Sequence, residues 1–370
     1  MEEYDRIEIQ HICSNICSGG TPKSTVEEYY GGTIPWLNTK EINFNRIYKT
    51  EKTITDEGLN NSSAQWIPAK SVIVAMYGAT AGKTAITQIP LTTNQACCNL
   101  TIDSTKADYR FVFYALCNDY AYLASLANGG AQQNLNAQQI REFEIPYPSI
   151  EEQECIADIL SSLDDKIELN LWINDNLEQQ AQALFNEMFP HITKGENMIG
   201  DLIMPKRGKG LLSKNAIKGD IPVVAGGIEP ATYHNQANTT APVLTIAASG
   251  ANAGYINLWH IPVWASDSSY IDDSITPNVY FWYIMLKKRQ KEIFDAQVGS
   301  AQPHIYPKHI AELPMNVVFV EKIAEYNEIV TPIFEKKGQL FLESKRLTSL
   351  RDTLLPKLMS GELKINDINN

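Results

Sequence analysis

Two long stretches of the chain carry apolar residues at alternating spacings of four and three. The first stretch runs from Ile156 to Met188 and the second from Tyr326 to Leu358. A spacing of this kind, sustained over several heptads, predicts helices that pack on each other as a coiled coil. At a rise of about 1.5 Å per residue, a helix of about 35 residues extends roughly 50 Å, so we expect both helices to act as spacers.

The residues expected to pack between the two helices are Ile156, Leu160, Leu163, Ile167, Leu177, Leu184, Val330, Ile333, Leu340, Leu347, Leu354 and Leu358. Polar residues interrupt both patterns near the middle, at Asn170 and Asn174 in the first and at Lys337 and Ser344 in the second. Buried polar positions cost stability but can fix register and choice of partner. The alternative interpretation is an unrelated pair of solvated helices.

The segments that precede these helices mix strand and helix signals. Apolar runs bounded by Gly and Pro predict strands at Val72–Met76, Ala96–Ile102 and Val243–Ala247. Helices are expected at about 108–128 and 277–297, where apolar residues gather on one side. Each segment is therefore expected to be mixed α/β with irregular strands, and an alternation of parallel βαβ units is not evident.

The chain repeats once internally. Residues 131–140 align with residues 301–310 at an offset of 170, and the two heptad stretches follow the same offset without a gap. Upstream, Gly78–Gly82 faces Gly250–Gly254 at an offset of 172, as expected if loops were inserted in one of two diverged copies. The sequence thus predicts two copies of a variable domain, each followed by a more constant helix.

The net charge of −12 is unevenly distributed along the chain. Residues 149–193 contain ten acidic residues and one basic residue, whereas the rest is close to neutral. The second heptad stretch carries several cations, so the two helix surfaces are partly complementary. The near-neutral domains can still present basic faces to phosphates, so the acidic total does not exclude a nucleic-acid partner.

Composition indicates a globular protein of two or more domains, with 44% hydrophobic and 20% charged residues. The longest apolar run, Val279–Leu286, is too short to cross a membrane, and the acidic start Met1-Glu2-Glu3 is no signal peptide. We therefore expect a cytoplasmic protein with no membrane partner. The six cysteines form no Cys-x-x-Cys pair, so we expect reduced thiols and no metal site.

Catalytic motifs are missing from the sequence. The loop from Gly78 to Thr84 resembles a phosphate-binding loop, but it has three residues between its glycines where that motif needs four. A glycine-rich turn that lets the backbone approach another backbone, such as that of DNA, explains both copies better. No Asp/Asn-Pro-Pro-Tyr/Phe methyltransferase tetrapeptide occurs. We expect a non-catalytic chain that binds no cofactor.

Several short segments resemble those of the specificity subunits of type I restriction-modification enzymes. These are Ser18–Pro22, Tyr29–Trp36, Gly299–Pro303, Ile310–Pro314 and the closing Leu355–Leu363. The first copy departs from the family pattern with Gln133 where the second has Pro303, and the second copy lacks the Gly-Gly-Thr-Pro opening.

The resemblance implies an α/β (α+β) fold with two mixed α/β target-recognition domains in internal repeat, separated by two long helices that form an antiparallel coiled coil. The expected boundaries are 1–148 for the first recognition domain, 149–193 for the first helix, 194–316 for the second recognition domain, 317–362 for the second helix and 363–370 for a tail.

The resemblance also implies a function. Each recognition domain would read one half of a gapped site in double-stranded DNA, in a bacterium or archaeon. The helices would bind two methyltransferase subunits that methylate adenine at N6 with S-adenosylmethionine, and a full enzyme would add two restriction subunits that use ATP and magnesium. Two other classes stay open: a coiled-coil adaptor that binds proteins without affinity for DNA, and a solitary DNA-binding regulator.

The candidate DNA-contacting residues are polar or basic side chains in glycine-rich loops at corresponding places in the two copies. Small residues permit close approach, and amide, hydroxyl or guanidinium groups can bind base edges and phosphates. In the first copy the candidates are Lys23, Lys40, Tyr77, Thr80, Lys83, Asn94, Gln95, Gln132, Gln133 and Asn134. In the second copy they are Lys206, Arg207, Lys209, Lys214, Ser249, Asn252, Gln302, His304 and Lys308.

Overall fold

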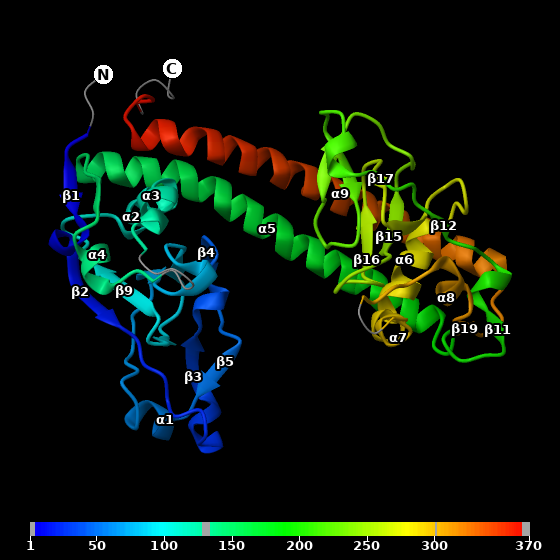
Figure 1. The fold of residues 1–370 in the computed structure, drawn as a ribbon, viewed down its shortest axis with the longest axis horizontal. Helices are drawn as coiled ribbons and strands as arrows, with labels where there is room; N and C mark the ends of the chain where they lie inside the picture. The colour runs from blue at the N-terminus through cyan, green and yellow to red at the C-terminus, as the bar shows by residue number, and fades with distance from the viewer. Residues whose placement is uncertain (1–3, 128–133, 300–301, 365–370) are drawn as a thin grey trace. The chain divides into compact units, whose positions relative to one another are not determined.

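The computed structural model describes residues 4–127, 134–299 and 302–364. The chain divides into two compact units, unit 1 with residues 1–167 and 346–370, and unit 2 with residues 168–345. Each unit combines a mixed α/β region with part of both long helices, α5 (Ile150–Met188) and α9 (Val320–Met359) (Figure 1). The heptad patterns therefore mark two long helices, as predicted from the sequence.

Among the described residues, the α/β region of unit 1 contains three sheets. The largest has the strand order β2-β9-β6-β7-β4, with bounds Cys13–Ser18, Cys97–Ile102, Val72–Ala75, Thr84–Thr87 and Asn45–Ile47. The second has the order β5-β3-β8, with bounds Lys52–Ile54, Tyr30–Leu37 and Thr92–Thr93. The third pairs β1 (Arg6–Glu8) with β10 (Glu144–Pro146). Short helices α1 (Asp56–Asn60) and α4 (Ala137–Arg141) complete the region.

Unit 2 contains sheets of corresponding strand order. The largest has the order β12-β18-β15-β16, with bounds Lys206–Arg207, Ser268–Ile271, Val243–Ala247 and Ile256–Trp259. The second has the order β14-β13-β17, with bounds Thr232–His234, Ile221–Val224 and Trp264–Ala265. The third pairs β11 (Asn197–Met198) with β19 (Pro314–Met315), and α8 spans Pro307–Ala311. Most pairings in both units are antiparallel, consistent with the lack of a βαβ pattern.

The single helices predicted at 108–128 and 277–297 are wrong in one respect, because each is broken near its middle. Unit 1 has α2 (Tyr109–Asn118) and α3 (Tyr120–Ser125), and unit 2 has α6 (Val279–Lys288) and α7 (Gln290–Asp295). The breaks fall at Asp119 and Arg289, which are 170 positions apart.

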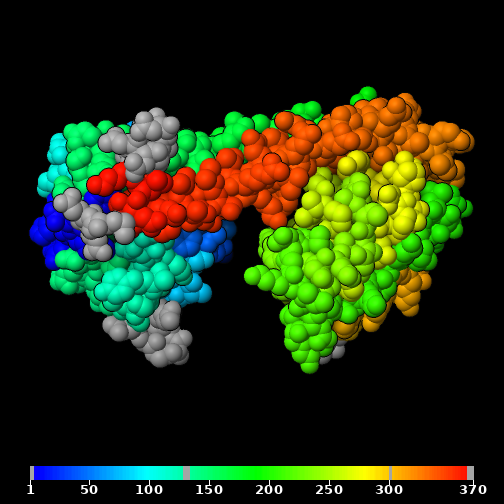
Figure 2. Space-filling view, turned by 90° about the horizontal axis from the view of Figure 1, so that it is seen from above, coloured from blue at the N-terminus to red at the C-terminus, as the bar shows by residue number. Residues whose placement is uncertain are grey.

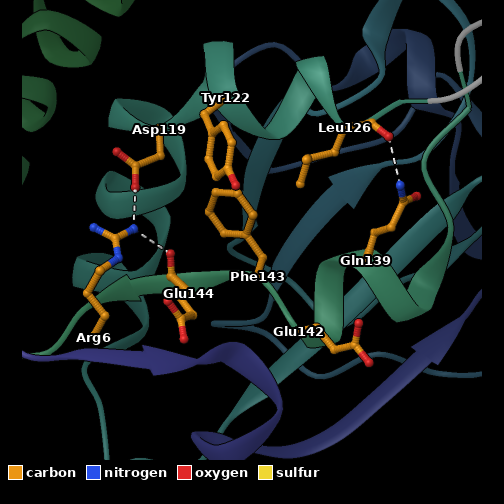
Figure 3. A pocket seen from close by; sticks show the side chains of 8 residues that line it. All are labelled: Arg6, Asp119, Tyr122, Leu126, Gln139, Glu142, Phe143 and Glu144. Carbon is orange, nitrogen blue, oxygen red and sulfur yellow. Dashed lines mark hydrogen bonds and ion pairs between the residues drawn. The ribbon is translucent and has the colours of Figure 1, made fainter.

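Tertiary contacts hold these breaks. Asp119 accepts a hydrogen bond of 3.1 Å from Arg6, and Arg6 also donates to the carbonyl of Glu144 at 2.6 Å (Figure 3). In unit 2, buried Arg289 itself donates to the carbonyl of Pro314 at 2.6 Å. The corresponding carbonyls of Glu144 and Pro314 are thus bound by arginines from different places in the two units, and helical periodicity does not reveal these bonds.

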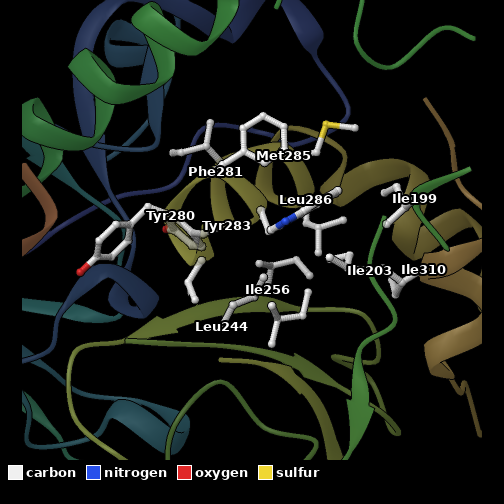
Figure 4. Close-up of a cluster of buried hydrophobic side chains, with 14 of the residues drawn as sticks. Ile199, Ile203, Leu244, Ile256, Tyr280, Phe281, Tyr283, Met285, Leu286 and Ile310 are labelled. Atoms are coloured by element: carbon white, nitrogen blue, oxygen red, sulfur yellow. The ribbon is translucent and has the colours of Figure 1, made fainter. Parts of the chain in front are cut away.

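Helix α6 forms the centre of the unit 2 core. Every residue from Val279 to Leu286 is buried, which explains why this helix is apolar on all sides. Figure 4 shows Leu244 and Ile256 of the sheet on one side of α6, with Phe281 pointing to the other side. There Phe281 contacts Phe185 of α5 and Tyr326 of α9 at ring-centroid distances of 5.5 and 6.1 Å. The long helices therefore cover the second face of α6.

Within unit 2, α5 and α9 run in opposite directions. Asn170 is fully buried and donates to Glu343 at 2.9 Å, while Tyr326 donates to the carbonyl of Ala181 at 2.9 Å. All predicted packing positions on both helices are buried or half-buried. Asn170 and Ser344, polar residues at the middle of the two heptad patterns, are thus hydrogen-bonded across the helices.

An ion pair and a tyrosine tie the α/β region of each unit to the helices. In unit 2, Glu178 of α5 binds Lys337 of α9 and accepts a hydrogen bond of 2.8 Å from Tyr283. Burial alone would raise the pKa of Glu178, but Lys337 holds it below its ordinary value. His260 lies against Gly338, and burial lowers the pKa of His260 to about 4.

Unit 1 uses the same chemistry at other positions. Asp164 of α5 accepts hydrogen bonds from Arg351 of α9 at 2.7 Å and from Tyr114 of α2 at 2.6 Å. Burial, followed by the charge of Asp164, raises the pKa of Tyr114, so this phenol stays protonated and donates.

We predict that Phe281→Ala lowers the free energy of unfolding by about 3–5 kcal/mol, because it leaves a cavity between α6 and both long helices. Phe319→Ala is the matched control, since Phe319 is 76% exposed, and it should change stability by less than about 0.5 kcal/mol. Urea unfolding followed by circular dichroism measures both. Equal effects of the two substitutions would contradict this description of the core.

Candidate nucleic-acid interface

A glycine-rich loop follows the central strand of each large sheet. In unit 1 it runs from β6 to β7, and Gly78 and Gly82 have φ angles of 72° and 83°. In unit 2 it runs from β15 to β16, and Gly250 and Gly254 have φ angles of 82° and 87°. Backbone in this region favours glycine, which explains the spacing of the two glycines in both copies. Each loop leads into a strand, whereas a phosphate-binding loop leads into a helix.

A second segment is hydrogen-bonded to each glycine-rich loop. Tyr77 forms an isolated bridge with Asn134, and Ser249 forms the corresponding bridge with His304. The adjacent backbone bonds also correspond, because Leu135 donates to the carbonyl of Met76 at 2.8 Å and Ile305 to that of Ala248 at 2.9 Å. The structure therefore brings together two regions that the sequence repeat identified separately.

A third segment is hydrogen-bonded at β9 in unit 1 and at β18 in unit 2, the strands that pair with β6 and β15, and its correspondence was missed from the sequence. The amide of Gly19 donates to the carbonyl of Cys97 at 3.3 Å, and that of Gly208 to the carbonyl of Ser268 at 2.8 Å. Ser18-Gly19-Gly20 thus corresponds to Arg207-Gly208-Lys209 at an offset of 189. The two segments share only one glycine at equivalent positions, Gly19 and Gly208, and their offset differs from that of the other segments. Sequence comparison therefore gave no signal for this correspondence.

We call these three segments together the loop frame. It comprises residues 18–20, 77–82 and 134–135 in unit 1, and residues 207–209, 249–254 and 304–305 in unit 2. A β-carbon at Gly19 would lie 2.3 Å from the carbonyl oxygen of Asn94, and one at Gly208 would lie 2.4 Å from that of Ala265. Glycine is needed at both places because two backbone segments pass at this distance.

The predicted residues of unit 1 divide between the loop frame and its surroundings. Lys23, Lys40, Tyr77, Gln95 and Asn134 are exposed, whereas Thr80, Lys83 and Asn94 are half-buried. The structure brings Tyr77, Thr80 and Asn134 together in the loop frame. Gln132 and Gln133 lie outside the described residues.

Three of the remaining predicted side chains of unit 1 are bound by protein groups. Lys40 forms an ion pair with Glu51, and the hydrogen bond from Lys40 to this carboxylate raises the pKa of the lysine. Lys83 donates to Asn43 at 2.7 Å. Asn94 accepts from the amide of Ala96 at 3.1 Å, so it shapes its own turn.

In unit 2, Lys206, Arg207, Lys209, Lys214, Gln302 and Lys308 are exposed, whereas Ser249, Asn252 and His304 are half-buried. The structure brings Arg207, Lys209, Ser249, Asn252 and His304 together in the loop frame. Lys206 precedes it and donates to Ser274 at 3.0 Å. Lys214, Gln302 and Lys308 lie outside it.

Asp267 binds two residues of the unit 2 loop frame, and sequence reasoning missed it. One carboxylate oxygen accepts from Arg207 at 2.6 Å, and the other accepts from the hydroxyl of Ser249. The amide of Ala248 donates to the Asp267 carbonyl at 3.1 Å, as that of Met76 donates to the Ala96 carbonyl at 2.8 Å. Ala96 therefore occupies the corresponding position in unit 1, where no carboxylate is present.

Figure 2 shows one face of the protein, on which the green to yellow residues of the unit 2 α/β region lie directly against the orange residues of α9.

Among the residues described, no group of three or more His, Cys, Asp or Glu side chains could hold a metal ion. No helix in the same part of the chain is long and apolar enough to span a membrane.

A cavity of about 630 Å³ opens in unit 1, apart from the loop frame. It is lined by Arg6, Asp119, Tyr122, Leu126, Gln139, Glu142, Phe143 and Glu144 (Figure 3). Gln139 donates to the carbonyl of Leu126 at 2.7 Å, and the Tyr122 and Phe143 rings are 5.7 Å apart. Its polar groups are largely paired with each other, as expected for a structural cavity beside the helix break.

Comparison with known proteins finds one group of similar proteins. Residues 1–179 match the family model of the type I restriction modification DNA specificity domain. A solved type I restriction-modification S subunit from M. genitalium shares the fold, with a TM-score of 0.63, 22% identity and coverage of 96% of both chains.

Curated relatives extend the similarity to the whole chain. The MjaIX specificity subunit of a type I restriction enzyme from Methanocaldococcus jannaschii is 27% identical, over 99% of this chain and 95% of its own length. A putative type I specificity subunit from Mycoplasma pneumoniae is 29% identical, over 78% of this chain and 83% of its own length. These relatives confirm the resemblance to type I specificity subunits that the sequence motifs predicted, and they indicate a specificity subunit.

We predict that Gly208→Ala disturbs the loop frame, because the new β-carbon would meet the carbonyl of Ala265. Such overpacking typically costs about 1–3 kcal/mol in unfolding free energy. Gly210→Ala is the matched control, since no atom lies within 4 Å of a β-carbon at Gly210. Thermal unfolding compares the two, and a fully stable Gly208→Ala protein would show that the close approach is not required.

Proposed function

We propose that the chain recognises a bipartite, gapped DNA site as the specificity subunit of a type I restriction-modification enzyme. The α/β region of unit 1 reads one half-site and that of unit 2 reads the other. One observation carries this proposal. The two units share the backbone bonds of the loop frame but differ in its side chains, with Tyr77 facing Asn134 in one and Ser249 facing His304 in the other. A shared backbone with different side chains suits two readers of different sequences.

The long helices are proposed to form an antiparallel coiled coil that spaces the two readers and binds two methyltransferase subunits. The opposite directions of α5 and α9 within unit 2 support the first part. The second is supported by the exposed apolar residues Leu171 and Trp172, which are 58% and 57% exposed outside the packing positions of the acidic helix α5. Such a surface suits a partner with a basic rim around an apolar centre.

In the proposed complex the chemistry belongs to the partners. The methyltransferase subunits transfer a methyl group from S-adenosylmethionine to N6 of adenine, and restriction subunits, where they accompany the complex, use ATP and magnesium to move along DNA and cut it. The chain itself is non-catalytic, since its sequence lacks the motifs for either reaction. Its role is to select the DNA site on which the partners act.

We predict that the purified chain alone transfers no methyl group, whereas the complex with its co-purifying methyltransferase methylates adenine in a gapped motif. Labelled S-adenosylmethionine and sequencing of the modified DNA measure both. A protein-binding adaptor would leave the complex without affinity for DNA. A solitary regulator would bind a specific sequence without any methyltransferase, so the three classes give different results.

We also predict that deleting residues 168–174 and 340–346 together shortens the unspecified gap. Each deletion removes one heptad, so the seam continues, and the helices shorten by roughly 10 Å, equivalent to at most about three base pairs. Both half-sites should keep their sequence. The matched control replaces the same residues with another heptad of equal length, and methylome sequencing reads the gap. An unchanged gap in an active deletion complex would contradict the spacer role.

A further inference from the structure

Arg207 and Asp267 form a charge pair at the surface of the unit 2 loop frame. The Nη2 atom of Arg207 lies 2.6 Å from Asp267, and the two side chains are 40% and 39% exposed. Ser249 occupies the second carboxylate oxygen. The carboxylate is thus anchored on both sides, and it holds one edge of the guanidinium in a defined direction.

The fold does not require this pair. The corresponding positions of unit 1 hold Ser18 and Ala96, which form no ion pair, and the surrounding backbone bonds are the same in both units. Stability does not explain the pair either, because ion pairs at this exposure contribute little to the free energy of unfolding. The pair therefore calls for an explanation in terms of what unit 2 binds.

A carboxylate is unfavourable on a surface that approaches phosphates, because like charges repel. An arginine that only neutralises a phosphate needs no such partner, and the neighbouring Lys209 has none among the residues described. A carboxylate that orients the arginine is useful when the direction of the guanidinium matters. Direction matters most in paired hydrogen bonds to the O6 and N7 atoms of guanine, which the planar guanidinium fits.

We propose that Arg207 reads a guanine in the half-site bound by unit 2, and that Asp267 is the positioning residue that aims it. This inference rests on the proposed function. It assigns a fixed guanine to the second half-site and no counterpart to the first, since unit 1 lacks both side chains. Lys209, by contrast, is assigned to a phosphate.

The test uses the full chain in complex with its methyltransferase, S-adenosylmethionine and a library of randomised DNA duplexes. Sequencing of the methylated duplexes gives the motif of the wild-type complex and of the variants Arg207→Lys, Asp267→Ala and Lys209→Ala. Arg207→Lys keeps the charge but loses the planar fork, so it separates base reading from phosphate binding. The half-site read by unit 1 reports folding and assembly within the same experiment.

We expect Arg207→Lys and Asp267→Ala to lose the preference for guanine at the same single position, by about tenfold or more, with the other half-site unchanged. Lys209→Ala should weaken all sequences alike and flatten the salt dependence of binding by about one unit. A guanine preference that survives Arg207→Lys, or an Arg207 effect equal at all sequences, would overturn the inference. A wild-type complex without any gapped motif would instead overturn the proposed function.

Discussion

The structure depends on a helix in unit 2 that is buried on both of its faces. Helix α6 packs on the sheet with one face, and its other face would be open to water without Phe185 of α5 and Tyr326 of α9. In unit 1, α2 is likewise buried over most of its length, in a core that includes Leu160 of α5. Burial of aromatic and aliphatic side chains is the main source of stability, so the α/β regions and the long helices form common cores and cannot be considered separate modules.

Polar contacts between α5 and α9 add specificity to the apolar packing, because they favour one arrangement of the two helices over others. Each unit uses an acid on α5, a base on α9 and a tyrosine from the α/β region: Glu178 with Lys337 in unit 2, and Asp164 with Arg351 in unit 1. Charges that are partly buried destabilise any arrangement that leaves them unpaired. A shift of one helix along the other would leave such a charge without its partner, so these ion pairs favour one register of the two helices. The buried carbonyl oxygen of Asn174, which has no partner among the described groups, marks the cost of such polarity.

The sequence predicted the features that depend on local periodicity and missed those that depend on contacts between distant segments. The heptad spacing marked both long helices, and apolar runs such as Val243–Ala247 marked central strands. The breaks at Asp119 and Arg289 were missed because they depend on arginine hydrogen bonds between segments far apart in the sequence. The candidate residues Tyr77 and His304 do lie in the loop frame. The sequence could identify them because the two copies align at nearly constant offsets around them. Asp267 carried no signal, since its role appears only when strand pairing brings it beside Arg207.

The two units differ in how the chain builds them. Unit 2 is a continuous stretch, residues 168–345, whereas unit 1 combines residues 1–167 with residues 346–370. Leu358 and Met359, close to the end of α9, are buried in the core of unit 1. During synthesis the ribosome therefore releases all of unit 2 before it releases the last part of the unit 1 core. The domain that is translated first is the last to be completed, and a ribosome that stalls before residue 358 leaves the N-terminal reader with an open core.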